Sequence, residues 1–209
     1  MCGRYAFFQE HEELERLLGR LDPLELEPRY NLSPTQLGLV AMQNGERRLE
    51  LMPWGLLPAW ATKGGPMINA RWESAAEKPY FRSAWKSRRC AVPASGWFEW
   101  KEEGGAKQPY FARQKDGTAM LFAGLWEDGK EWTGYAILTK DAEPGLREVH
   151  DRMPVILGPR EVDIWLDPES PREVLPELTR EWAETLDVFP VDRRVGRPAF
   201  DVPEAVEPL

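Results

Sequence analysis

The sequence predicts an α+β domain built around a curved, barrel-like antiparallel sheet with flanking helices. Three observations lead to this prediction. The 209-residue chain is long enough to bury a sizeable core, and 42% of it is hydrophobic. Its middle part contains five short runs rich in aromatic and β-branched residues, separated by turns that contain glycine. Apolar residues at helical spacing occur only in a few short segments.

The N-terminal part alternates between helix, loop and hairpin signals. Apolar spacing predicts a helix over residues 9–19. Turn formers predict a loop at 27–36. The runs LGLVAM and RLELMPW flank QNGE, whose Asn44-Gly45 pair is a strong β-hairpin signal. ATKGGP is expected to be a loop, and a short helix is expected to begin near Pro79.

The five strand-like runs are expected to form an antiparallel meander that curls on itself. They are RCAVP (89–93), GWFEWK (96–101), PYFARQ (109–114), AMLFAGLWE (119–127) and WTGYAILTK (132–140). Residues 159–167 then predict a helix with proline in its first turn, and 171–186 resemble an interrupted helix. The Pro-rich tail, 196–209, is expected to be irregular. Without repeats or an internal linker, residues 1–209 form a single predicted domain.

Composition excludes several classes of protein. The sequence contains no run of 18 apolar residues, so no membrane span is expected. It contains no basic leader followed by a long apolar stretch, so no secretory signal is expected. We therefore expect a cytoplasmic monomer, associated with the nucleoid if the source is bacterial. Two cysteines do not form a disulfide framework. The two histidines lack metal-ligand spacing, so neither a metal nor another cofactor is expected.

The charge is unevenly distributed. The net charge of −8 argues against nonspecific coating of DNA, but all of it comes from residues 161–209, and the first 160 residues are neutral overall. Within these, FRSAWKSRR holds four bases and no acid, including Arg82 and Lys86. This cluster is either a solvated surface or a local phosphate-binding groove.

The second residue is the first candidate for chemistry. Once Met1 is removed, Cys2 carries a free amine and a thiol on the same residue. Both groups can attack one electrophile, and an internal cysteine such as Cys90 lacks the amine. Cys90 is expected to be a small buried strand residue.

Three further residues stand out, each with a structural alternative. His150 lies at a predicted helix-to-strand junction, where sheets often present functional side chains, whereas His11 fits a solvated helix surface. Glu99 lies between two aromatic residues of a predicted strand; it either points to water or points inward, where burial would raise its pKa. Asn69 and Arg71, two apart, would share a face suited to a phosphate or carboxylate, or would belong to a structural turn.

Six motifs in order give a specific resemblance. MCGRY, RYNLSPTQ, WGLLPAW, INARWES, GWFEW and HDRMP occur between residues 2 and 154. Together they resemble the SRAP (SOS-response-associated peptidase) family, which senses abasic sites in single-stranded DNA. The resemblance implies an SRAP-like fold with a positively charged DNA channel. It also implies that Cys2 crosslinks to the ring-opened aldehyde of the lesion as a thiazolidine.

The resemblance also implies roles for individual residues. Asn69 would hold the N-terminus and the opened sugar, Glu99 would handle the proton of the amine, and His150 would help to open the sugar ring. The DNA contacts would come from Arg4, Asn31, Trp60 and Arg71, with Asn31 equally suited to capping. Two departures from the family pattern are Ala61 after Trp60, and Arg197 after Val195-Gly196.

Two other functions compete with this interpretation. A general cysteine peptidase could use Cys2 with Glu99 and His150, whereas a peptidase activity limited to removing Met1 or another short leader from the chain itself would be compatible with crosslinking. A noncovalent single-stranded DNA-binding module could use the tryptophans and the basic cluster alone. The crosslinking interpretation predicts an SDS-stable adduct with abasic DNA that is lost in Cys2→Ala. Neither a general peptidase nor a noncovalent module predicts such an adduct.

Overall fold

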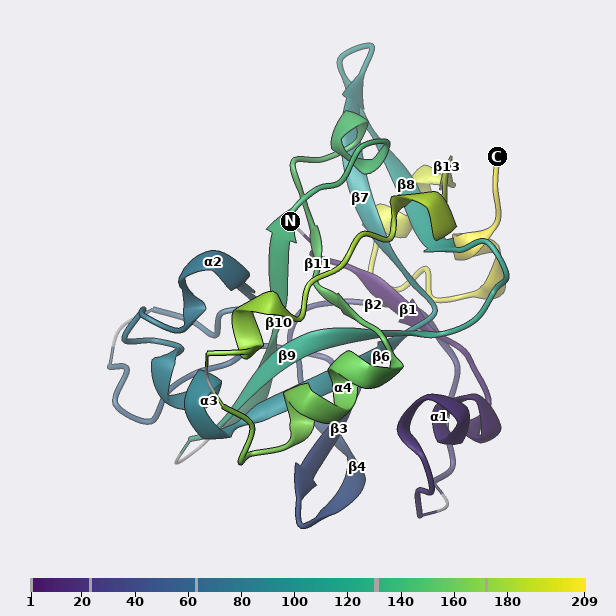
Figure 1. Ribbon diagram of the computed structural model, residues 1–209. Helices are drawn as coiled ribbons and strands as arrows, with labels where there is room; N and C mark the ends of the chain where they lie inside the picture. The colour runs from purple at the N-terminus through teal and green to yellow at the C-terminus, as the bar shows by residue number, and fades with distance from the viewer. Residues whose placement is uncertain (1, 23, 63, 130–131, 172) are drawn as a thin grey trace.

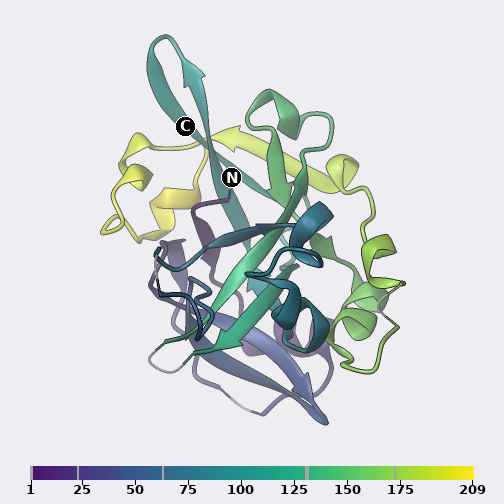
Figure 2. The same ribbon diagram turned by 90° about the vertical axis from the view of Figure 1, so that its left-hand side faces the viewer.

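Two curled, mainly antiparallel sheets form the framework of the protein, as the computed structural model shows (Figures 1 and 2). It describes residues 2–22, 24–62, 64–129, 132–171 and 173–209. The sheets are open rather than closed into a barrel, since β13 and β2 are the edges of one and β11 and β4 the edges of the other. The predicted α+β class and curved sheet are confirmed.

The first sheet has the strand order β13-β8-β7-β1-β2. Its strands are β1 (Tyr5–Phe7), β2 (Arg29–Leu32), β7 (Gly96–Glu103), β8 (Ala106–Gln114) and β13 (Leu186–Pro190). The tip of the β7–β8 hairpin projects beyond the rest of the molecule in both views (Figures 1 and 2).

The second sheet has the order β11-β10-β9-β6-β3-β4, with β12 beside β9 and β5 parallel to β10. Its strands are β3 (Leu37–Asn44), β4 (Glu46–Pro53), β5 (Asn69–Arg71), β6 (Arg89–Ala94), β9 (Met120–Asp128), β10 (Thr133–Asp141), β11 (Arg152–Pro154) and β12 (Ile156–Leu157). The predicted β3–β4 hairpin is confirmed, and Gly45 between its strands has a φ of 80°, which favours glycine.

Helices are few and short in the described residues. They are α1 (His11–Leu18), α2 (Trp72–Ala75), α3 (Arg82–Ser87) and α4 (Pro159–Leu166). The 3₁₀ turns are η1 (Leu146–Glu148), η2 (Leu175–Glu177), η3 (Ala183–Thr185), η4 (Arg193–Gly196) and η5 (Pro203–Val206). The predicted helices correspond to α1, α3 and α4. No helix among the described residues is long and apolar enough to cross a membrane.

The predicted meander is wrong in its connectivity, although all five strands are present as β6–β10. β6, β9 and β10 belong to the second sheet, whereas β7 and β8 belong to the first. The chain changes sheet at Ser95, whose N–H donates to the carbonyl of Ala6 and whose hydroxyl accepts from the N–H of Phe8. The N-terminal strand therefore draws β7 away from β6, a long-range pairing that a local residue pattern does not report.

The interrupted helix expected at 171–186 is mostly irregular where the structure describes it. Residue 172 lies outside the described residues, and η2 and η3 are the only helical turns of the described part. β13, which follows, was not predicted; it pairs with the edge of β8 from Leu186↔Gln114 to Pro190↔Tyr110.

The C-terminal tail is irregular, as expected, but it is firmly packed. The turns η4 and η5 contribute Val195, Ala205 and Val206 to a small apolar cluster with Phe98 and Phe111 of the β7–β8 hairpin. The larger core lies between the two sheets and includes the buried Cys90. Tail packing therefore covers one face of the strand that carries Glu99.

Gly96 lets β7 begin close to its neighbours, and its replacement by alanine is expected to destabilise the fold. A Cβ there would lie 2.2 Å from Cζ of Phe111 and 2.5 Å from the carbonyl oxygen of Ala112. Because one of these atoms is backbone, the strands must shift, which costs about 1–3 kcal/mol. Gly65→Ala is the control, since a Cβ at Gly65 meets nothing within 4 Å. Urea unfolding measures both; equal midpoints for the two variants would contradict the prediction.

Candidate active site

The N-terminus, β5, β7 and the η1–β11 junction bring four of the predicted residues together. Tyr5 of β1 pairs with Trp97 of β7, and the N–H of Phe98 donates to the carbonyl of Arg4 at 3.0 Å. This pairing carries Cys2 to the flank of β7, where the side chain of Cys2 is fully buried.

Asn69 holds the backbone of the terminal cysteine. Its Nδ2 donates to the carbonyl oxygen of Cys2 at 2.7 Å, and its side chain is buried. The position of Asn69 is set by parallel pairing of β5 with β10, in the register Ile137↔Asn69. The Oδ1 atom of Asn69 is buried and accepts no hydrogen bond from the described residues, so it is available to a donor on a bound molecule.

Glu99 points inward, which decides between the two orientations that the sequence allows. Its side chain is only 6% exposed. The pKa of Glu99 is raised from 4.5 to about 7, mainly by burial and to a small extent by the nearby carboxylate of Asp151. A carboxyl group with this pKa both accepts and donates protons near neutral pH.

His150 approaches Glu99 from the η1–β11 junction, with Nε2 lying 3.9 Å from Oε2. Its Nδ1 accepts from the N–H of Arg152 at 3.0 Å and also lies 2.8 Å from Oδ1 of Asp151. One nitrogen cannot accept from the amide and donate to the carboxylate at once. Burial lowers the pKa of His150 below 6.5, which favours the neutral ring. The side chain of Asp151 is 83% exposed, so water screens its attraction for a proton on Nδ1. The hydrogen bond from the N–H of Arg152 therefore decides that Nδ1 is the acceptor nitrogen of the neutral ring. A neutral ring that accepts this hydrogen bond at Nδ1 carries its proton on Nε2.

The thiol of Cys2 is neutral at physiological pH. Burial raises its pKa well above the ordinary value, and the carboxylate of Glu99 raises it further. Its Sγ lies 3.8 Å from the carbonyl oxygen of Arg4, to which the thiol can donate. Cys2 and Cys90 are both free, and burial likewise raises the pKa of Cys90.

A cavity of about 400 Å³ opens at Glu99 and His150, and neither Cys2 nor Asn69 is among the residues that line it. It is lined by Glu99, Trp100, Lys107, His150 and Gly196. Lys107 and Gly196 were not singled out from the sequence, because they come from the far strand of a hairpin and from the tail. No cluster of three or more metal-ligating side chains occurs in the part of the chain that the structure describes.

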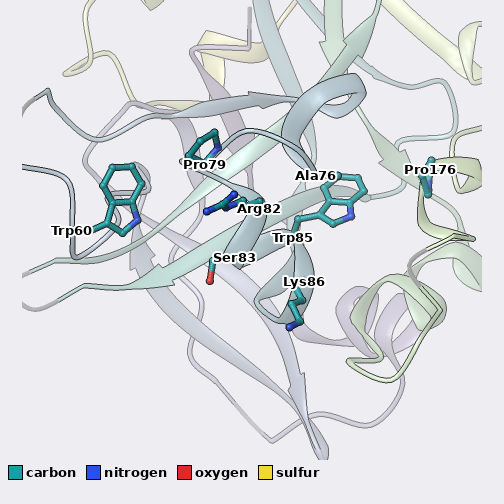
Figure 3. Close-up of a pocket in the computed structure, with 8 residues that line it drawn as sticks. All are labelled: Trp60, Ala76, Pro79, Arg82, Ser83, Trp85, Lys86 and Pro176. Atoms are coloured by element: carbon teal, nitrogen blue, oxygen red, sulfur yellow. The ribbon is translucent and has the colours of Figure 1, made fainter.

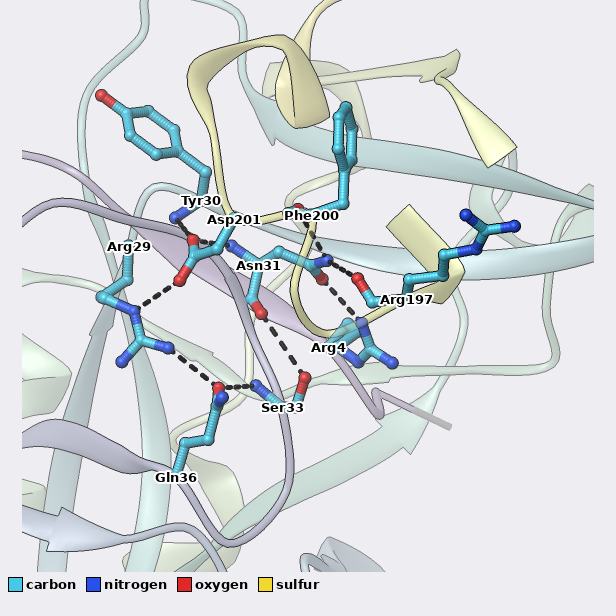
Figure 4. A network of polar contacts seen from close by, with 9 residues as sticks. All are labelled: Arg4, Arg29, Tyr30, Asn31, Ser33, Gln36, Arg197, Phe200 and Asp201. Carbon is cyan, nitrogen blue, oxygen red and sulfur yellow. Dashed lines mark hydrogen bonds and ion pairs between the residues drawn. The ribbon is translucent and has the colours of Figure 1, made fainter. Parts of the chain in front are cut away.

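Asn31 and Arg4 bind the C-terminal tail (Figure 4). Asn31 is fully buried, and its Nδ2 donates to the carbonyls of Val195, Arg197 and Phe200. Arg4 donates from Nη1 to Oδ1 of Asn31 at 2.8 Å. The side chain of Asn31 therefore anchors the tail in this structure and is not exposed to a DNA strand.

Trp60, Arg82 and Lys86 meet at a second hollow, of about 820 Å³ (Figure 3). Trp60 is 61% exposed and packs edge-on against Tyr80, while Arg82 and Lys86 lie one turn apart on α3 and are exposed. This hollow shares no lining residue with the cavity at Glu99. Arg71 is exposed at the end of β5 and lines neither this hollow nor the cavity at Glu99.

The amide of Asn69, the carboxyl group of Glu99 and the imidazole of His150 lie at one end of the chain's N-terminal segment, which makes this place a candidate active site with Cys2 as its buried thiol. The chain belongs to the SOS response associated peptidase (SRAP) family, whose model matches residues 1–198. This confirms the resemblance that the six motifs indicate.

Named relatives and solved structures agree with this assignment. The chain is 35% identical over the full length of both proteins to "Abasic site processing protein YedK" of Escherichia coli. It is 30% identical to "Abasic site processing protein HMCES" of Gallus gallus, over 87% of this chain and 66% of that protein. A crystal structure from Bacteroides thetaiotaomicron shares the fold over 100% of both chains, with a TM-score of 0.88 at 23% identity. The crystal structure of a phage-related protein of Bordetella bronchiseptica has a TM-score of 0.79 at 33% identity, over 97% of this chain and 100% of that one.

His150 is expected to titrate below its ordinary pKa and to be neutral at pH 7 with the proton on Nε2. Nitrogen-detected NMR of the imidazoles measures both properties, and the only other histidine, His11, serves as the internal reference. A proton on Nδ1, or a pKa above 6.5, would contradict the geometry described for His150.

Glu99→Gln is expected to stabilise the protein at pH 8 but not at pH 5. Because the folded pKa of Glu99 is raised, the wild type loses stability as the pH rises from 4.5 through about 7, by up to about 3 kcal/mol. Glutamine does not ionise and escapes this loss. Denaturant unfolding at the two pH values measures the difference, with Glu102→Gln, at an exposed position of the same strand, as the control. A gain in stability that is equal at both pH values would rule out burial of an ionising group as its cause.

Proposed function

We propose that this chain processes abasic sites in single-stranded DNA by capturing the ring-opened sugar at Cys2 as a thiazolidine. The observation that carries the proposal is the hydrogen bond from Asn69 to the carbonyl of Cys2, beside a cavity lined by Glu99 and His150. The names of the relatives support the class of substrate. Removal of Met1, by the chain itself or by an aminopeptidase, is a precondition, because the reaction needs a free amine on Cys2.

The reaction begins with the sugar. An abasic deoxyribose exists mainly as a ring, and opening it requires a proton at the ring oxygen and loss of one from the C1′ hydroxyl. The neutral His150 carries its proton on Nε2, which suits it to protonate the departing ring oxygen. The product is an aldehyde at C1′.

The amine of Cys2 then attacks the aldehyde carbon, and the resulting carbinolamine loses water to form a Schiff base. Glu99, with a pKa of about 7, accepts a proton from the attacking amine and returns one to the departing hydroxyl. Asn69 holds the backbone of Cys2 during both steps and offers its buried Oδ1 to a donor on the sugar.

The thiol closes the ring. Its sulfur adds to the imine carbon while its proton passes to the nitrogen, so the overall reaction releases one water molecule. The raised pKa of Cys2 keeps the thiol neutral until the imine is present, and the addition is intramolecular. The closed ring removes the electrophilic imine, which accounts for a durable adduct.

A general cysteine peptidase fits the site less well. Such enzymes attack with a thiolate, which is stabilised by a neighbouring cation. Here burial and the carboxylate of Glu99 both raise the pKa of Cys2. A purely noncovalent DNA-binding module would not need a buried terminal cysteine with an amide on its carbonyl.

The DNA strand is expected to contact exposed cations and one exposed ring. Arg71, at the end of the strand that carries Asn69, is suited to a phosphate, as are Arg82 and Lys86 on α3. Trp60 can stack on a base, an interaction worth about 1–3 kcal/mol. Phosphate contacts position a strand without reading its sequence, so little sequence preference is expected.

The test compares three proteins with single-stranded DNA that carries one abasic site. Wild-type protein without Met1 is expected to form an adduct that survives SDS and heat. Cys2→Ser keeps the amine but lacks the thiol, so its adduct is expected to survive only after borohydride reduction. Cys90→Ser is the control, because its buried thiol has no amine, and it is expected to crosslink like the wild type.

Intact mass reads the result. The expected increase equals the mass of the DNA minus one water, and it appears only in molecules without residue 1. If wild-type protein binds the DNA but shows no such mass, or if Cys2→Ser gives an equally stable adduct without reductant, the thiazolidine mechanism is wrong.

A further inference from the structure

The tail residues 195–201 are joined to the N-terminal residues by a partly buried polar network (Figure 4). At its outer end, the carboxylate of Asp201 accepts from the backbone N–H groups of Tyr30 at 2.5 Å and Asn31 at 2.8 Å. The same carboxylate forms an ion pair with Nε of Arg29 at 2.6 Å. At its inner end, Asn31 donates to three tail carbonyls at 3.0–3.1 Å.

Arg4 connects this network to the active site. Its Nη1 donates to Oδ1 of Asn31 and to the carbonyl of Val195, both at 2.8 Å, and its Nη2 donates to the carbonyl of Gly196 at 3.3 Å. Arg4 is two residues from Cys2, whose Sγ lies against the carbonyl of Arg4. Gly196 also lines the cavity at Glu99 and His150. The tail therefore touches both the arginine beside the nucleophile and the wall of the cavity.

We propose that Asn31 and Asp201 are positioning residues for the reaction at Cys2. They hold segment 195–201 against the guanidinium of Arg4, and Arg4 in turn keeps Cys2 buried and correctly placed relative to the cavity. The effect on the rate of adduct formation rests on the proposed function. The effect on the position of Cys2 does not.

Three anchors then fix the first residues of the chain. Asn69 holds the carbonyl of Cys2, the N–H of Phe98 holds the carbonyl of Arg4, and the tail holds the guanidinium of Arg4. The first two act on the backbone. The third is the one that a change at Asp201, far from the reacting atoms in sequence, can weaken without altering the residues that hold the backbone.

Loss of the network is not expected to unfold the protein. The tail is also held by an apolar cluster in which Val195 and Ala205 are fully buried. The expected result of weakening Asp201 is therefore local opening near the N-terminus rather than global unfolding.

The test uses the full-length protein without Met1 and the isosteric variant Asp201→Asn. The amide cannot form the ion pair with Arg29. Its oxygen can still accept from the N–H groups of Tyr30 and Asn31, but its NH₂ group then faces Nε–H of Arg29, which is also a donor. Glu204→Gln is the matched control, since it neutralises an exposed acid of the same tail. Asn31→Asp, which keeps the size of the side chain but loses the donors to the tail carbonyls, is the second variant.

Two measurements are made on each protein. The first, without DNA, is the rate at which iodoacetamide alkylates Cys2 and Cys90, resolved by peptide mass. The second is the rate of adduct formation at saturating concentrations of abasic single-stranded DNA. Because Cys90 is buried in the core, its alkylation reports global opening.

Asp201→Asn and Asn31→Asp are expected to alkylate at Cys2 about 10-fold faster than the wild type, with no change at Cys90. Their adducts are expected to form about 10-fold more slowly, because a displaced nucleophile reacts slowly even when it is more exposed. Glu204→Gln is expected to match the wild type in both measurements.

Unchanged alkylation of Cys2, or a parallel rise at Cys90, overturns the positioning role. So does a wild-type rate of adduct formation in variants whose Cys2 has become more reactive. If the wild type forms no adduct at all, the proposed function fails, while the alkylation rates still decide whether the tail positions Cys2.

Discussion

The hydrogen bond from Asn69 to the carbonyl of Cys2 is the contact on which the site depends. A chain terminus is ordinarily mobile, since it has backbone on one side only. Here an amide from β5 fixes the first carbonyl that remains after Met1 is lost, at 2.7 Å. The parallel pairing of β5 with β10 sets the position of that amide. Cys2 is thus held by the sheet, although it belongs to no strand itself.

Burial of the site has opposing effects on its groups. It raises the pKa of Glu99 to about 7 and lowers the pKa of His150 below its ordinary value of 6.5, so His150 is neutral at pH 7. It also raises the pKa of Cys2, which suppresses the thiolate. A mechanism that began with the sulfur would be hindered by this burial. A mechanism that begins with attack by the amine nitrogen can use Glu99 and His150 for proton transfer. It does not need a thiolate in its first step, so suppression of the thiolate does not hinder it.

Sequence alone predicted the local features well and the long-range ones poorly. Asn44-Gly45 predicted its hairpin because two residues determine the turn, and six short motifs identified the family. The division of β6 and β7 between two sheets escaped prediction, since it depends on pairing with β1, which lies near the start of the chain. Alternation left the direction of Glu99 open, and only packing of the whole domain settled it. Asp201 had no signal, because its partners lie near the other end of the chain.

The depth of Cys2 has a chemical consequence that exposure alone would not suggest. An imine in open water is hydrolysed readily, whereas Cys2 has no exposed surface in the folded protein. In the proposed reaction, the same walls that bury the sulfur would restrict the access of water to the imine carbon. The thiol would already be on the attacking residue. Burial would therefore favour ring closure over hydrolysis at the step where the two compete.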